Sequence, residues 1–72
     1  SPNPAKEYIV IKFTQNVNGT LLIHDGLGNQ VMEQEINNEK NKNISLQDLN
    51  SGIYFISVKT NAKTVIKRLI KY

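Results

Sequence analysis

The segment Leu49–Val58 constrains the fold most, because a turn leads directly into a strand with apolar residues on both faces. Apolar residues alternate from Tyr54 to Val58 on one face, while Ile53 and Phe55 make the other face apolar as well. A strand of this kind is expected in the middle of a sheet or covered on both sides.

Short β-type segments separated by turn residues make up most of the chain. We expect turns at Gln15–Gly19, which includes the hairpin signal Asn18-Gly19, and at Gly26–Asn29, and an exposed loop over the polar stretch Asn37–Asn43. The acids of Gln30–Ile36 are typical of an edge strand. No segment has the periodicity of a helix, so the spacing predicts an all-β sandwich or small barrel of six or seven strands. The expected strands are Tyr8–Phe13, Thr20–Asp25, Gln30–Ile36, Ile44–Leu46, Ile53–Thr60 and Thr64–Ile70.

The chain has 72 residues, which is enough for one small domain. A domain of this size buries only roughly 60% of the surface that its unfolded form exposes. With no cysteine and one histidine, the sequence offers neither a disulfide nor a structural zinc site, so apolar burial must supply the stability. The net charge is +3, and basic residues gather near the end, which favours a partner with negative potential. These residues are Lys59, Lys63, Lys67, Arg68 and Lys71.

The opening segment Ser1–Pro4 is typical of the exit from a linker, because its prolines favour extended backbone. We therefore expect residues 1–5 to be a linker, residues 6–72 to be the folded domain, and the chain to be part of a longer protein. No segment contains the about 20 apolar residues of a spanning helix.

Candidate catalytic groups are better explained as ordinary strand and surface residues. His24 and Asp25 are neighbours on a strand, so their side chains point to opposite faces and cannot form a catalytic imidazole–carboxylate pair. Glu33 and Glu35 share a face, but a solvated edge explains them better than a cation site. We expect neither an enzyme nor a bound metal or cofactor.

The basic segment Lys67–Lys71 has two interpretations. Its cations protect an edge strand against aggregation, or they dock onto a protein or an anionic lipid headgroup. A nucleic-acid site would add exposed aromatic residues. Because Tyr8, Phe13, Tyr54 and Phe55 are expected mostly in the core, we expect no nucleic-acid partner.

Several motifs follow one another along nearly the whole chain. They are Pro2-Asn3-Pro4, Ile23-x-Asp25 followed by Gly28-Asn29-Gln30-Val31, Ile44-x-Leu46, Leu49-x-x-Gly52-Ile53-Tyr54-Phe55, and Lys67-Arg68-Leu69-Ile70-Lys71. Together they resemble the C-terminal sorting domain of the bacterial type IX secretion system, in its common form called type A. The sequence departs from that pattern at Tyr72, where the family often has a basic residue, and at Asn29, where lysine is frequent.

This resemblance implies a small immunoglobulin-like antiparallel β-sandwich of six to seven strands, at the end of a larger cargo protein of a Bacteroidetes-type bacterium. The domain would take the cargo from the periplasm across the outer membrane to the cell surface or the medium. Its implied partners are the outer-membrane secretion machinery and a sortase-like protease that removes the domain. An exposed final strand would also permit a homodimer through paired edges. The recognition residues that the resemblance implies are Pro2, Asn3, Pro4, Gly52, Tyr54, Lys67, Arg68, Leu69, Ile70 and Lys71.

The alternative is an immunoglobulin-like accessory module of a secreted enzyme, which binds carbohydrate or acts as a spacer. Exposed aromatic residues on one sheet would favour this alternative. Position in the parent gene separates the two, because a sorting signal must end the reading frame.

Overall fold

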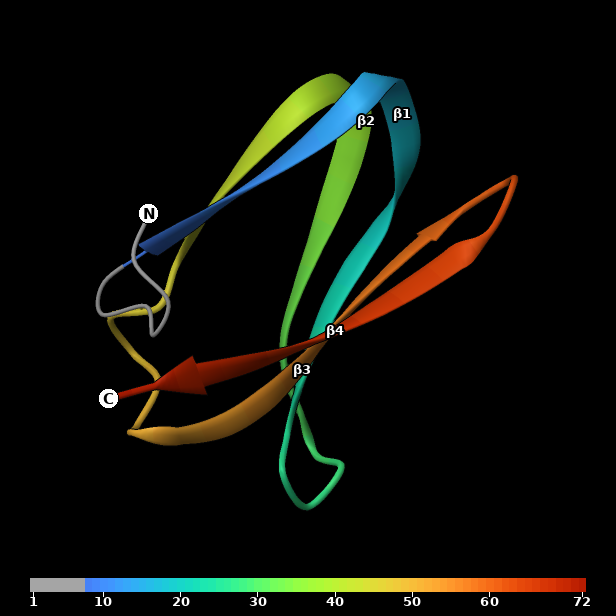
Figure 1. The fold of residues 1–72 in the computed structure, drawn as a ribbon. Helices are drawn as coiled ribbons and strands as arrows, with labels where there is room; N and C mark the ends of the chain where they lie inside the picture. Colours follow the sequence, from blue (N-terminus) through green and yellow to red (C-terminus); the bar gives the residue numbers. More distant parts are fainter. Residues whose placement is uncertain (1–7) are drawn as a thin grey trace.

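A computed structural model describes residues 8–72, which form one antiparallel sheet (Figure 1). The order across the sheet is β2-β1-β3-β4, so β1 and β3 are central and β2 and β4 are its edges. The all-β prediction is confirmed, as are the central position of the strand after Gly52 and the edge position of Gln30–Ile36. The strands are β1 (Tyr8–Asp25), β2 (Gln30–Ser45), β3 (Gly52–Thr60) and β4 (Thr64–Lys71).

The predicted immunoglobulin-like sandwich of six to seven strands is wrong, because the described chain forms four strands in one sheet. β1 joins two of the expected strands, and β2 continues through Asn37–Asn43, which the sequence predicts to be a loop. The β1–β2 pairing runs along both strands, with register shifts between Lys12 and Gly19. Turn-type residues produce bulges here, and a bulge bends a strand without ending it.

Asparagine side chains support the backbone at this bend. Asn18 Oδ1 accepts the Asn38 N–H at 2.8 Å, and Asn38 has a φ of 51°. Asparagine tolerates this left-handed conformation better than most residues. Asn16 Nδ2 also lies 3.4 Å from the Asn38 carbonyl oxygen. The irregular positions therefore keep hydrogen-bond partners across the hairpin.

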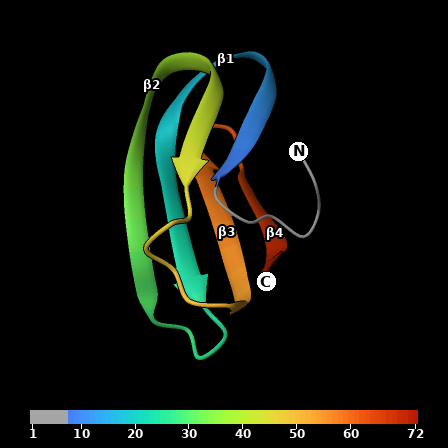
Figure 2. The same ribbon diagram turned by 90° about the vertical axis from the view of Figure 1, so that its left-hand side faces the viewer.

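The β1–β2 hairpin folds back across the rest of the sheet. The Tyr8–Lys12 half of β1 pairs with Asn41–Ser45 of β2, whereas the Gly19–Asp25 half pairs with both β2 and β3. Figure 2 shows the first half of β1 and the end of β2 in front of β3 and the second half of β1. One sheet thereby encloses a core without a second, separate sheet.

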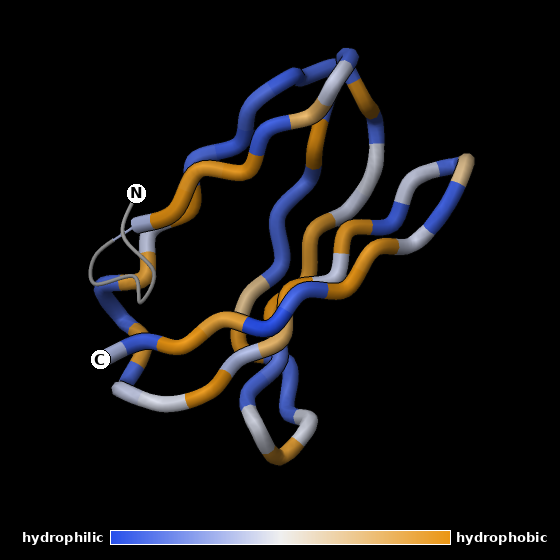
Figure 3. The backbone as a smooth tube through the Cα atoms, in the orientation of Figure 1, coloured by the Kyte–Doolittle hydropathy of each residue, from blue (hydrophilic) through white to orange (hydrophobic). Residues whose placement is uncertain are grey.

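Side chains from all four strands and from the segment after β2 fill this core. In Figure 3 apolar positions recur along β1, β3 and β4, while the middle of β2, an edge strand, is mostly hydrophilic. The inner face of β3 is buried as predicted. The core residues are Leu21, Ile23, Ile36, Ile44, Leu46, Tyr54, Ile56, Val58 and Leu69.

The prediction that the aromatic residues lie mostly in the core is only partly right. Tyr54 is buried and Phe13 packs against the core, but Tyr8 is 57% and Phe55 38% exposed. Phe55 pairs with Arg68 on the outer face of β3, and that face also exposes Ile53. The sequence predicts that this strand is central or covered on both sides; it is central, and residues 8–72 cover its inner face while Ile53 and Phe55 stay exposed on its outer face.

Candidate functional site

The basic segment of the sequence lies on β4, at the edge of the sheet. Among the residues that the structure describes, β4 pairs only with β3, so its outer edge presents unpaired backbone groups. Lys67 pairs with buried Ile56 and lies on the inner face, while Arg68 pairs with Phe55 on the outer face. Both cations are exposed. They therefore flank one free strand edge from its two sides.

Lys71 has a different environment from these two cations. Its ammonium group donates hydrogen bonds to the backbone carbonyl oxygens of Leu46 and Leu49. The Leu49 N–H donates to the same Leu46 carbonyl at 3.1 Å, which closes a turn between β2 and β3. The Lys71 charge is thus engaged within the domain, where it satisfies two carbonyls of the turn.

Tyr54 and Gly52 shape the chain just after this turn. The buried Tyr54 donates its hydroxyl to the Asn50 carbonyl oxygen at 2.6 Å. Gly52 begins β3 with a φ of 154°, a conformation that strains other residues. Both motif residues therefore determine how the chain enters β3, and Tyr54 contributes to the core as well.

The pairing of β3 with β4 brings together two motifs that are separate in the sequence, the one that contains Gly52 and Tyr54 and the one that ends at Lys71. Gly52 pairs with Lys71, and Tyr54 pairs with Leu69, which is also buried. Ile70 lies on the opposite face and is partly exposed. The three remaining positions of the implied recognition set, Pro2, Asn3 and Pro4, lie outside the described residues.

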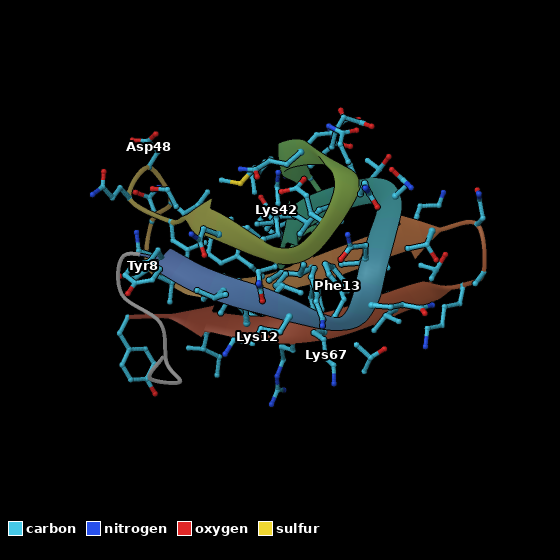
Figure 4. The ribbon with its side chains drawn as sticks, turned by 90° about the horizontal axis from the view of Figure 1, so that it is seen from above. Tyr8, Lys12, Phe13, Lys42, Asp48 and Lys67 are labelled. Carbon is cyan, nitrogen blue, oxygen red and sulfur yellow. The ribbon has the colours of Figure 1, made fainter. Side chains whose placement is uncertain are left out.

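A groove of about 560 Å³ opens between the folded-back half of β1 and strand β4. Lys12 and Phe13 of β1 and Lys67 of β4, which are labelled in Figure 4, line the groove. Its lining is apolar on both sides, with Ile9, Ile11, Phe13 and Val17 from β1 and with Ile56, Val58, Val65 and Leu69 from β3 and β4. Its charged lining residues are Lys12, Lys63, Lys67 and Arg68, and no acid is among the lining residues of the described chain.

Asp25 organises the turn between β1 and β2. Its Oδ1 accepts the backbone N–H groups of Leu27 and Asn29, each at 2.9 Å. The Asn29 N–H, and to a lesser degree its side-chain amide, hold the pKa of the Asp25 carboxyl below its usual range. Gly28 has a φ of 92°, which supports the turn that the sequence predicts at Gly26–Asn29. The motif aspartate is therefore a turn residue.

The sequence did not reveal the groove, because no local pattern tells that the hairpin folds back over β3 and β4. It identified Lys63 and Lys67 as basic residues near the end, but it did not connect them with Lys12 and Phe13, about fifty positions earlier. The alternation of Ile9, Ile11 and Phe13 was the available signal, since it marks the face of β1 that lines the groove.

Residues 8–72 contain no group of three or more His, Cys, Asp or Glu side chains placed to hold a metal ion. In the same part of the chain there is no long apolar helix of the kind that crosses a membrane. The features that stand out are the free edge of β4, its two exposed cations and the adjoining groove.

Comparison with known proteins supports the family that the sequence motifs resemble. No curated protein and no solved structure matches the chain. A family model described as the secretion system C-terminal sorting domain matches residues 1–72, the whole chain. This family is not an enzyme family; it consists of type IX secretion sorting signals, which implies contact with secretion machinery and export across the outer membrane. The chain belongs to the secretion system C-terminal sorting domain family.

Proposed function

We propose that this domain directs a larger cargo protein across the outer membrane through recognition of its last strand, β4. The whole-chain family match supports the sorting role. The exposed Lys67 and Arg68 beside a free strand edge support β4 as the recognition element. A partner can add a strand to such an edge, where backbone hydrogen bonds give affinity and side chains give specificity.

Further steps follow from this role. Residues 1–5 form a linker, residues 6–72 the sorting domain, and a sortase-like protease of the outer-membrane machinery removes the domain after transport. The cargo passes through the periplasm of a Bacteroidetes-type bacterium, and the domain itself performs no catalysis. Prolines at positions 2 and 4 support a linker, because they favour extended backbone that a protease can reach.

Charge reversal on β4 tests the recognition element. A reporter carries an inner-membrane export signal at its start and this domain at its end. Lys67→Glu with Arg68→Glu should leave the reporter in the periplasm, whereas Lys40→Glu with Lys59→Glu should leave secretion normal. The control pair is also exposed and makes the same change in net charge. Normal secretion of the Lys67→Glu, Arg68→Glu variant would show that the cations of β4 are not needed for recognition.

These substitutions are preferable to deletion of residues 67–72. That deletion would also remove buried Leu69 and the Lys71 contacts with the turn, so it would unfold the domain and abolish any function. Circular dichroism of each variant shows that the fold is intact before secretion is compared.

One observation favours a second candidate function, an accessory module that binds carbohydrate or acts as a spacer. Phe55 is exposed on the outer face of the sheet together with Ile53 and Ile66. An exposed aromatic ring on a flat sheet face suits a sugar ring. If Phe55→Ser abolished binding to a polysaccharide while secretion did not depend on the domain, this candidate would replace the sorting role.

The free edge of β4 also permits a homodimer in which two such edges pair. Both edges would carry the same cations, Lys67 and Arg68, and like charges placed opposite each other oppose this pairing. Sedimentation of the domain at low and high salt tests it, since screening would strengthen the dimer.

A further inference from the structure

We infer that the groove between the first half of β1 and strand β4 receives an extended peptide segment in which apolar and acidic residues alternate. This inference deepens the proposed function, because it gives the chemistry of the partner segment that β4 recognises. The segment adds to the free edge of β4, its apolar side chains enter the groove, and its acidic side chains remain at the cationic mouth.

The strand edges beside the groove suit an added strand. β4 pairs with β3 on one side, and the Tyr8–Lys12 half of β1 pairs with β2 on one side. Within the described residues, each of these two stretches has its other edge free, and the groove lies between them. An added strand satisfies unpaired backbone groups, which a lipid acyl chain cannot do. The backbone edge therefore favours a peptide over a lipid.

The lining specifies which side chains the segment carries. Phe13 and Ile11 face the groove from β1, and Val65 faces it from β4, so the groove accepts apolar side chains. Because successive residues of a strand point to opposite faces, every second residue of the segment would enter it.

The charges specify the remaining positions. Lys12, Lys63, Lys67 and Arg68 line the groove, and the lining contains no acid from the described part of the chain. Lys12 lies on β1 and Lys67 on β4, so cations line the groove from both strands (Figure 4). Lys12 alternates with the groove-facing Ile11 and Phe13, and Arg68 lies on the outer face of β4. Carboxylates at the outward positions of the segment would neutralise these two cations, whereas a basic segment would be repelled.

The outer face of the sheet is a less suitable place for the same segment. Ile53 and Phe55 are exposed there, but they lie on β3, whose two edges are already paired with β1 and β4. A peptide on that face would bury apolar side chains without pairing its backbone. The outer face therefore supplies the negative control for the test.

Two nine-residue peptides provide the probes, one alternating Val with Glu and the other alternating Val with Lys. Each is titrated into the ¹⁵N-labelled 72-residue chain, and the amide resonances report the binding site. The Val–Glu peptide should shift Thr64–Leu69 and Ile9–Phe13, and it should bind at least about tenfold more tightly than the Val–Lys peptide at low salt. Lys12→Glu with Arg68→Glu should reverse this preference, while Lys40→Glu with Lys59→Glu should preserve it.

Equal affinity for the two peptides, binding of neither, or shifts confined to Ile53 and Phe55 would overturn the groove assignment. Shifts of the groove amides by phosphatidylglycerol vesicles, with no response to the Val–Glu peptide, would also overturn it in favour of a lipid. In each case the reporter assay still decides the proposed function. If secretion depends on β4 but the domain does not prefer the Val–Glu peptide, the sorting role is retained and only the groove is rejected as the peptide site.

Discussion

Gly19 leaves no room for a side chain, because a Cβ at this position would lie 2.1 Å from the Lys59 carbonyl oxygen. Gly19 pairs with Thr60, so the obstacle is the backbone of β3, which cannot move without disturbing the sheet. Gly19→Ala should lower the free energy of unfolding by about 1–3 kcal/mol. Gly26→Ala is the matched control, since its Cβ would meet its nearest neighbour at 3.7 Å. Equal loss in the two variants in urea titrations would contradict this close approach.

Asp25 should make the stability of the domain fall in acid. Hydrogen bonds from Asn29 lower its pKa in the folded state, so the folded state favours the charged carboxylate. The resulting stability is complete above about pH 5 and is lost as the pH falls through the lowered pKa. Asp25→Asn keeps an acceptor but removes the charge.

Thermal unfolding from pH 7 down to pH 2 tests this sign. The melting temperature of the parent domain should exceed that of Asp25→Asn at neutral pH, and the difference should shrink on acidification. Glu39 also has a lowered pKa, caused mainly by the Asn37 N–H and then by Lys42, so both proteins lose some stability in acid. A difference that grew as the pH fell would contradict the role given to Asp25.

At the scale of the elements, β4 both stabilises the domain and offers its free edge. Lys71 binds the carbonyls of Leu46 and Leu49, whereas Lys67 is exposed. Lys71→Met should therefore lower the free energy of unfolding by about 1–2 kcal/mol, because two turn carbonyls lose a charged donor. Lys67→Met should change it by less than about 0.5 kcal/mol. Urea titration compares the two variants, and identical stabilities would exclude the structural role of Lys71.

The elements also show where sequence reasoning succeeded. The central strand β3 and the basic edge strand β4 follow from patterns within about ten residues, namely apolar alternation and local charge. The turn at Asp25–Asn29 likewise follows from local glycines. These features are decided by the residues themselves.

Sequence reasoning failed where tertiary contacts override local preference. Asn18–Gly19 has the composition of a hairpin turn, yet Gly19 lies within β1 against β3, and Asn18 accepts the Asn38 N–H. The stretch Asn37–Asn43 is polar because it forms an exposed edge, not because it leaves the sheet. β1 and β2 therefore continue through the two stretches that were expected to interrupt them, and one folded sheet forms in place of the predicted sandwich.

The same limit applies to the implied recognition residues. Gly52, Tyr54 and Lys71 occur in motifs that resemble a recognition signature, but their contacts lie within the domain. Lys67 and Arg68 are the exposed cations of that set. Position in a motif does not separate a residue that maintains the fold from one that meets a partner, whereas burial and hydrogen bonding do.

At the scale of the whole molecule, the domain combines a small core with an accessible edge. The core extends from Leu21 to Leu69 along the chain and stabilises the sheet without disulfides. The β4 edge and its groove lie beside this core, so a partner can bind them while the fold stays intact. This arrangement suits a domain that is recognised in its folded form.

Export of a reporter is the most direct test of the sorting role. A fluorescent protein with an inner-membrane export signal is joined at its end to residues 1–72, in a bacterium that has type IX secretion, and its location is followed by surface protease accessibility and by fractionation. The reporter should reach the cell surface or the medium only when the domain is attached and the secretion system is intact. A reporter that stays in the periplasm with the folded domain attached would contradict it.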